Sequence, residues 1–206
     1  MSTRPWLHAY PEGVAADIDA STYASLVDLM QDSFARFPER VAFSFMGRDM
    51  RYAELDRLSQ VFAAYLQSLG LSPGDRVAIM LPNVLQYPVA VAAILRAGYV
   101  VVNVNPLYTA RELEFQLKDS DAKVIVILEN FAATLEKCLA NTAVKHVVLC
   151  AMGDRLGWLK GMVVNHVVRR VKKMVPAFSL PRAVRFNDAL AKGEQSPLTL
   201  PSIGGE

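Results

Sequence analysis

Residues 73–109 decide the fold, and they read PGDRVAIMLPNVLQYPVAVAAILRAGYVVVNVNPLYT. After a Pro-Gly-Asp turn, two nearly continuous apolar runs, at 76–81 and 99–104, enclose a helical stretch at about 84–97. Strands that lack an alternation of polar and apolar residues are buried on both faces, which is typical of a parallel sheet. The stretch therefore predicts a strand, a helix and a second strand parallel to the first.

The same alternation of strands and helices continues on the C-terminal side of this stretch. Apolar strand runs are expected at 124–128 and 147–150, with helical stretches at 110–119 and 131–141. This order implies right-handed crossovers and helices on both faces of one sheet. On the N-terminal side the sequence predicts a helix over 25–37, an antiparallel hairpin over 41–52 and an amphipathic helix that ends near Gly70. The expected fold class is α/β, with a mainly parallel sheet and flanking helices.

The composition excludes several classes of protein. Of the 206 residues, 52% are apolar and 20% are charged, which supports a buried core and argues against global disorder. Cys138 and Cys150 have no paired spacing, so we expect buried thiols rather than a disulfide framework or a zinc site. The three histidines lie in unrelated segments, and no metal site is expected.

No known sequence motif identifies a catalytic or cofactor-binding residue in this chain. The chain has no Gly-x-Ser-x-Gly elbow, no Gly-x-Gly-x-x-Gly turn and no Gly-x-x-x-x-Gly-Lys loop. Residues 1–10 lack the apolar core of a secretory signal. Residues 77–95 carry no charge over nearly the length of a transmembrane helix, but Pro82 and Pro88 interrupt them, so a strand, a turn and a core helix are expected there instead. The expected location is the cytoplasm, with peripheral association with the inner face of the membrane.

Five strings together resemble a known family in their order and spacing. They are RYAEL at 51–55, PGDRVAI at 73–79, LPNVLQYP at 81–88, ILRAGYVVVNVNPLYT at 94–109 and RELE at 111–114. They resemble the N-terminal portion of the adenylate-forming acyl-CoA synthetases, specifically the bacterial long-chain fatty acid:CoA ligases. The resemblance spans about Trp6 to Leu190, with one small departure, because Arg51 stands where the family usually has Thr.

The resemblance implies the incomplete N-terminal domain of an adenylate-forming enzyme. Such an enzyme activates a long-chain fatty acid with ATP and magnesium to an acyl-adenylate, and then transfers the acyl group to coenzyme A. The family's phosphate loop with its lysine, its Tyr-Gly-x-Thr-Glu stretch, its ribose-binding Asp and its C-terminal lysine do not occur in this sequence. We therefore expect the first part of a ligase, inactive by itself. The alternative is a truncated, non-catalytic membrane-binding or interaction module of the same fold. A homodimer is a further assembly to test.

Asn105 and Tyr108 are the weak candidates for substrate binding. They follow the strand run 99–104, at the edge where parallel sheets place ligands. The alternative is a backbone role, because Pro106 keeps Asn105 extended and the Asn amide can satisfy the loop. Arg96 is expected to be a solvated charge at a helix end.

Residues 155–182 form a basic segment, with seven Lys or Arg and no acidic residue. Projected as one helix over 156–175, the segment has an apolar face and a basic face, which is typical of a helix that lies on a membrane surface. The expected contacts with an anionic membrane are Trp158, Lys160, Arg169, Arg170, Lys172 and Lys173. The alternative is a helix docked on its own protein, and no nucleic-acid partner is expected because no aromatic residues alternate with the charges.

The segment also sets the expected domain organisation. Residues 1–150 would form the first part of the adenylate-forming domain, and 151–184 would be the basic amphipathic insert. Residues 185–206 would hold a short helix and a linker toward an ATP-binding part.

Overall fold

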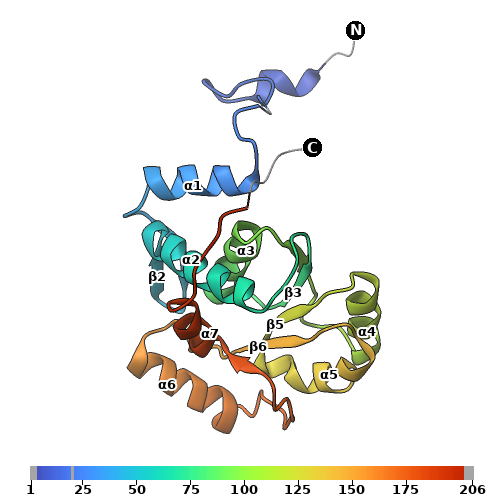
Figure 1. Ribbon diagram of the computed structural model, residues 1–206. Helices are drawn as coiled ribbons and strands as arrows, with labels where there is room; N and C mark the ends of the chain where they lie inside the picture. The colour runs from blue at the N-terminus through green and yellow to red at the C-terminus, as the bar shows by residue number, and fades with distance from the viewer. Residues whose placement is uncertain (1–3, 20, 202–206) are drawn as a thin grey trace.

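A five-stranded parallel sheet is the centre of the computed structural model, which describes residues 4–19 and 21–201 (Figure 1). The strand order is β4-β3-β5-β6-β7, and all neighbouring pairs are parallel. The strands are β3 (Arg76–Met80), β4 (Val100–Asn103), β5 (Val124–Leu128), β6 (His146–Cys150) and β7 (Val184–Arg185). The predicted parallel α/β sheet is confirmed. Residues 1–3, 20 and 202–206 lie outside the described residues, so expectations that fall on them are not addressed by the structure.

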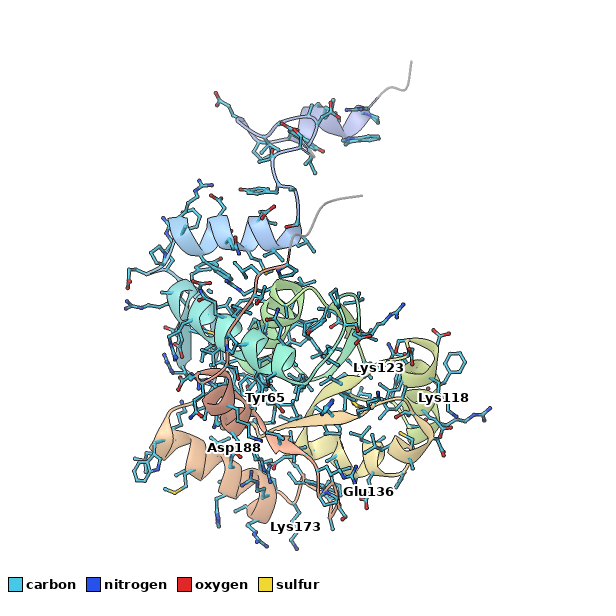
Figure 2. The ribbon with its side chains drawn as sticks, viewed as in Figure 1. Tyr65, Lys118, Lys123, Glu136, Lys173 and Asp188 are labelled. Carbon is cyan, nitrogen blue, oxygen red and sulfur yellow. The ribbon has the colours of Figure 1, made fainter. Side chains whose placement is uncertain are left out.

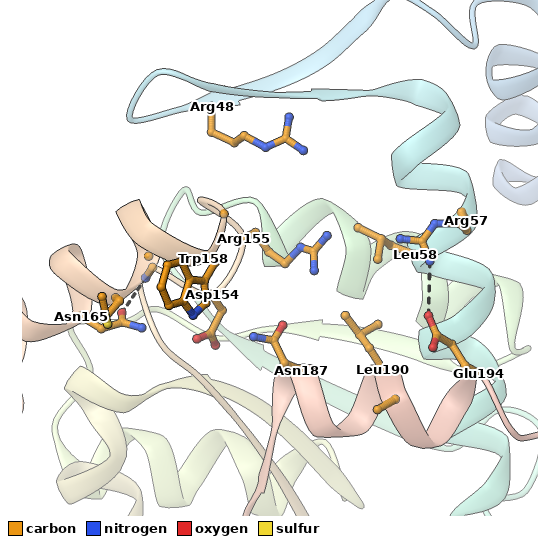
Figure 3. Close-up of a pocket in the computed structure, with 15 residues that line it drawn as sticks. Arg48, Arg57, Leu58, Asp154, Arg155, Trp158, Asn165, Asn187, Leu190 and Glu194 are labelled. Carbon is orange, nitrogen blue, oxygen red and sulfur yellow. Dashed lines mark hydrogen bonds and ion pairs between the residues drawn. The ribbon is translucent and has the colours of Figure 1, made fainter.

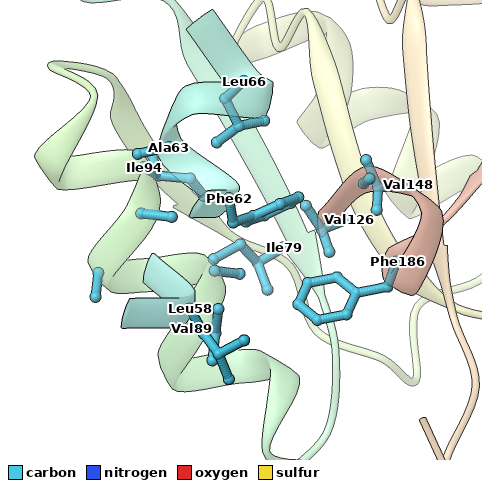
Figure 4. Close-up of a cluster of buried hydrophobic side chains, with 14 of the residues drawn as sticks. Leu58, Phe62, Ala63, Leu66, Ile79, Val89, Ile94, Val126, Val148 and Phe186 are labelled. Atoms are coloured by element: carbon cyan, nitrogen blue, oxygen red, sulfur yellow. The ribbon is translucent and has the colours of Figure 1, made fainter. Parts of the chain in front are cut away.

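Helices cover both faces of this sheet. The helices α2 (Tyr52–Ser68), α3 (Gln86–Arg96) and α7 (Phe186–Gly193) pack with side chains such as Ile79 and Val126 (Figure 4). On the other face, α4 (Ala110–Asp119) and α5 (Ala132–Glu136) pack with Ile125 and Ile127. Successive strand residues point to opposite faces, so the apolar runs supply both cores at once. Strand β4 departs from this pattern because it lies at the edge of the sheet, where Val100 stays half-exposed.

The N-terminal elements precede the sheet. A short 3-10 helix, η1 (Pro5–Ala9), is followed by α1 (Leu26–Arg36), whose N-cap Ser25 accepts a hydrogen bond from the backbone N–H of Asp28 at 3.1 Å. The predicted hairpin consists of the antiparallel strands β1 (Val41–Phe45) and β2 (Arg48–Arg51). Its register shifts between Val41 and Phe43, and both of these side chains remain half-exposed.

One local expectation is wrong. The helix expected over 131–141 is broken into the 3-10 turn η2 (Glu129–Phe131), the five-residue α5 and the 3-10 turn η3 (Leu139–Asn141). Helix α3 begins after Leu85 without a side-chain cap. The side chain of Gln86 is buried and donates a hydrogen bond to the carbonyl oxygen of Ala151 at 2.7 Å.

The basic segment does not form one helix over 156–175. It contains α6 (Trp158–His166) and then η4 (Val167–Val171), one turn of π-helix. Gly161 of α6 lies so close to Gly153 that a methyl group on either residue would overlap the other's carbonyl oxygen. Within 4–19 and 21–201, no helix is long and apolar enough to cross a membrane.

Candidate functional site

The carboxyl ends of β3 and β5 mark the place where a sheet of this order is expected to hold a ligand. Strand β4 lies on one side of β3, whereas β5, β6 and β7 follow one another on the other side. The winding of the chain therefore reverses between β3 and β5, and doubly wound sheets bind ligands in the crevice at such a reversal.

A buried carboxylate, Glu129, stands at this point, directly after β5. Its side chain accepts hydrogen bonds from Nε of Arg169 at 2.8 Å and from Nη2 of the same residue at 3.0 Å. Arg185, at the end of β7, donates a third hydrogen bond at 3.0 Å. Only 1% of Glu129 is exposed, and a buried charge requires partners of this kind. The hydrogen bond with Glu129 raises the pKa of Arg169 above its ordinary value.

The end of β6 adds two further groups, the half-buried Asp154 and the buried Cys150. Asp154 accepts the backbone N–H of Ala151 at 2.7 Å, and burial raises the pKa of this carboxyl group. Burial also raises the pKa of the Cys150 thiol well above its ordinary value. A buried thiol that resists ionisation is a poor nucleophile, so Cys150 serves as an apolar core residue.

The two weak substrate candidates lie in the loop after β4. The side-chain oxygen of Asn105 accepts the backbone N–H of Leu107 at 3.0 Å, which is the backbone role considered as the alternative. Tyr108 lines a cavity of about 710 Å³ along α4, together with Thr109, Arg111, Glu112, Phe115, Gln116 and Asp119. Substrate binding by Asn105 and Tyr108 stays a prediction.

The six expected membrane contacts divide into two groups. Trp158, Arg170, Lys172 and Lys173 are exposed, and these three basic side chains form no ion pair within the described part of the chain. Figure 2 shows Lys173 at the periphery of the molecule. Two of the six are held by the protein, since Arg169 binds Glu129 and the ammonium group of Lys160 donates to the backbone oxygen of Met46.

Apolar and basic side chains succeed one another along the α6–η4 segment instead of occupying opposite faces. The contact at Gly161 fixes which side of α6 faces the body, and Val168 of η4 is buried on that side. Most of the exposed apolar side chains lie in the first turns of α6, and these are Trp158, Leu159, Met162 and Val163, whereas Val171 is exposed at the end of η4. We call the four residues of α6, together with Arg170, Lys172 and Lys173, the α6 surface.

A second cavity, of about 560 Å³, lies between α2, α6 and α7 (Figure 3). Its lining includes three arginines, Arg48, Arg57 and Arg155, and the side chain of Trp158. Sequence reasoning missed this cavity and the cluster around Glu129, because their members come from distant segments. The one available signal was a glutamate placed directly after the fully apolar strand 124–128.

Comparison with solved structures identifies the fold. The crystal structure of a benzoate CoA ligase from Burkholderia xenovorans LB400 matches the fold with a TM-score of 0.65 and 18% sequence identity. The match covers 87% of this chain and 30% of that chain. The fold is therefore that of the adenylate-forming enzymes, represented here by part of their length.

The chain belongs to the AMP-binding enzyme family, whose sequence profile matches residues 30–193. A long-chain-fatty-acid–CoA ligase of Escherichia coli O6:H1 is 53% identical over 199 residues, which are 96% of this chain and 36% of that protein. The ligase of the same name from Haemophilus influenzae is 48% identical over 98% of this chain and 36% of its own length. The chain thus spans about a third of the length of the curated relatives that it matches, and the resemblance seen in the five strings is confirmed.

Proposed function

We propose that this chain forms part of a long-chain-fatty-acid–CoA ligase. The observation that carries the proposal is the 53% identity to the Escherichia coli ligase over nearly the whole chain. Such a ligase joins a long-chain fatty acid to coenzyme A at the expense of ATP, with magnesium as the metal. The activity belongs to a protein of the relatives' length, of which this chain supplies the sheet and its covering helices.

The residues of this chain do not fit an ATP phosphate site. At the reversal of the sheet the described side chain is the carboxylate of Glu129, whose two oxygens already accept hydrogen bonds from two arginines. Arg169 and Arg185 neutralise this carboxylate and are held by it, and the family's phosphate-binding motifs do not occur in the sequence. We therefore assign no step of the reaction to residues of this chain, and we expect it alone to form no acyl-adenylate.

A chimera tests this proposal. The aligned segment of the Escherichia coli ligase is replaced by this chain, and formation of oleoyl-CoA from oleate, ATP and coenzyme A is measured. We expect activity in the chimera, and none in the Escherichia coli protein from which the segment has been deleted. A chimera that folds but makes no acyl-CoA would favour the alternative, a non-catalytic module of the same fold.

We also infer that the α6 surface brings the protein to the cytoplasmic face of an anionic membrane. The support is the exposure of Trp158 (83%) and Leu159 (62%), large apolar side chains on the same segment as basic ones without ionic partners in the described chain. A fatty acid is concentrated in bilayers, so a ligase gains substrate by docking there. Each basic residue near such a surface contributes about 1 kcal/mol, and salt screens this contribution. Burial of Trp158 and Leu159 in the membrane surface adds a hydrophobic contribution to the binding free energy, which salt does not screen.

Co-sedimentation with vesicles of phosphatidylcholine and phosphatidylglycerol tests the docking. The variant Arg170→Glu/Lys172→Glu/Lys173→Glu should lose most of its binding. The matched control Arg111→Glu/Lys137→Glu/Lys145→Glu makes the same change of charge at exposed residues away from α6 and should keep more of it. Equal binding by the two variants, or no binding by the native chain at low salt, would exclude the α6 surface as the docking site.

A further inference from the structure

The 560 Å³ cavity between α2, α6 and α7 is not explained by the proposed function. Its volume lies within the range of small-molecule sites. Guanidinium groups come from three different elements, since Arg48 lies in β2, Arg57 in α2 and Arg155 in the loop before α6. Figure 3 shows Arg48 and Arg155 extending into the same space above Asn187 and Leu190 of α7.

The arginines of the cavity have more donors than the nearby acids can accept. Arg48 and Arg155 share one carboxylate, that of Glu54, at 2.8 and 3.1 Å. Nε of Arg155 is buried and has no acceptor among the described residues. Arg57 reaches Glu194 only at 3.4 Å, and both of these side chains are largely exposed. An anion placed among these groups would gain charge-assisted hydrogen bonds that the protein does not itself supply.

Two acids line the cavity, and they do not cancel this preference. Glu194 is largely exposed and lies 3.4 Å from Arg57. Asp154 accepts the backbone N–H of Ala151 and, in the described chain, forms no ion pair with the three arginines. Burial also raises the pKa of Asp154, which disfavours its negative charge.

Apolar groups complete the cavity. Leu58 and Leu190 are buried in its wall, while Trp158 and Met162 line it and are 83% and 52% exposed. An apolar lining that continues into exposed aromatic and thioether groups suits a hydrocarbon chain, and the arginines suit one anionic head group.

We propose that this cavity binds an anionic amphiphile, a carboxylate or phosphate carried on an aliphatic chain. Arg48 and Arg155 hold the head group, and the chain lies against Trp158 and Met162. The cavity borders the carboxyl ends of β6 and β7 rather than the reversal between β3 and β5. Its ligand requires neither ATP nor coenzyme A, so the site goes beyond the proposed ligase activity. It adjoins the α6 surface, from which an amphiphile of a membrane would reach it.

The fluorescence of Trp158 reports binding directly. The chain has two tryptophans, so the change Trp6→Phe leaves Trp158 as the only one. Laurate and dodecyl phosphate, below the concentrations at which they form micelles and without vesicles, should each shift its emission to shorter wavelength. Dodecanol, which has the same chain without the charge, should bind at least tenfold more weakly. A response to laurate alone identifies a free fatty acid as the source, and a response to dodecyl phosphate alone identifies a phospholipid head group.

Three substitutions test the role of the arginines. Arg155→Gln and Arg48→Gln should each weaken binding about tenfold or more, since each removes hydrogen bonds to a charged group. Glu54→Gln should tighten binding, because it removes the negative charge that competes with the ligand for both guanidinium groups. A misfolded variant would not give this gain. Arg51→Gln is the matched control, as Arg51 pairs with Glu39 and does not line the cavity.

Several outcomes would overturn the proposal. They are equal binding of dodecanol and laurate, an unchanged affinity in Arg48→Gln, or no response to either anion. Vesicle docking and the activity of the chimera do not depend on these results, so the amphiphile site can fail while the proposed function stands.

Discussion

At the scale of single residues, the charges that matter are those that the fold buries. The expectation that Arg96 is a solvated charge is wrong, because Arg96 is 5% exposed, pairs with Asp56 and lies over the ring of Phe34. Its partner is forty residues away in the chain, and no local pattern reveals such a pairing. The same holds for Glu129, whose two arginines follow it by forty and fifty-six residues.

Replacement of Glu129 tests the strength of this cluster. Glu129→Gln keeps the size of the side chain but removes its charge, leaving Arg169 and Arg185 with a neutral partner. Because both arginines are partly exposed and can be hydrated, we expect the free energy of unfolding to fall by about 1–3 kcal/mol. Urea denaturation of Glu39→Gln supplies the control, since Glu39 and Arg51 are both largely exposed and the loss should stay below about 1 kcal/mol. Equal losses in the two variants would contradict a special role for Glu129.

Asp154 predicts a dependence of stability on pH. Burial raises its folded-state pKa above the ordinary value of 3.8, so the folded protein retains this proton more readily than the unfolded chain. The contribution of Asp154 to stability is therefore fully present below pH 3.8 and is lost as the pH rises through the folded-state pKa. Asp154→Asn should stabilise the protein at neutral pH, with a gain that shrinks toward pH 4. Thermal unfolding of the exposed control Asp119→Asn should show no such trend.

At the scale of elements, the sequence predicts best those elements whose ends are set by local chemistry. The box of Thr109 and Glu112 begins α4 where expected, and Gly70, with a φ of +73°, follows α2 as expected. The basic segment was harder to predict, because the contact of Gly161 with Gly153 decides which side of α6 is buried. A helical projection shows which residues share a face of a helix. It does not show which face packs against the rest of the protein, and here the contact with Gly153 decides this.

The glycine contact under α6 can be tested by a single methyl group. Alanine favours helices over glycine by about 1 kcal/mol, so propensity alone predicts that Gly161→Ala stabilises α6. The added methyl group would instead overlap the carbonyl oxygen of Gly153, and we expect a net loss of about 1–3 kcal/mol from overpacking. Trypsin cleavage after Lys160, Arg169 and Arg170 should accelerate as well. Val163→Ala, at an exposed position of the same helix, is the control, and equally fast cleavage of both variants would exclude the contact as the cause.

At the scale of the whole molecule, the residues after the basic segment pack against elements of the first 150 residues. Strand β7 pairs with β6, and α7 packs on α2 so closely that a methyl group on Gly193 would overlap the backbone oxygen of Val61. The sequence predicts a short helix within 185–206, but the place of α7 beside α2 follows only from the fold. The proposed boundaries at 150 and 184 therefore separate segments that share one core.

A substitution of Phe186 tests whether the packing of α7 on α2 stabilises the whole molecule. The ring of Phe186 is fully buried and lies 5.0 Å from the ring of Phe62, between α7 and α2 (Figure 4). Phe186→Ala should lower the free energy of unfolding by about 3–5 kcal/mol, the range for a large aromatic side chain removed from a core. If residues 4–150 were an independent unit, the loss would be confined to α7, and amide hydrogen exchange in β3 and β5 would stay slow. We expect exchange to accelerate in those strands too, because Phe186 belongs to the same cluster as Ile79 and Val126. Exposed Phe115→Ala on α4 should leave exchange in both strands unchanged.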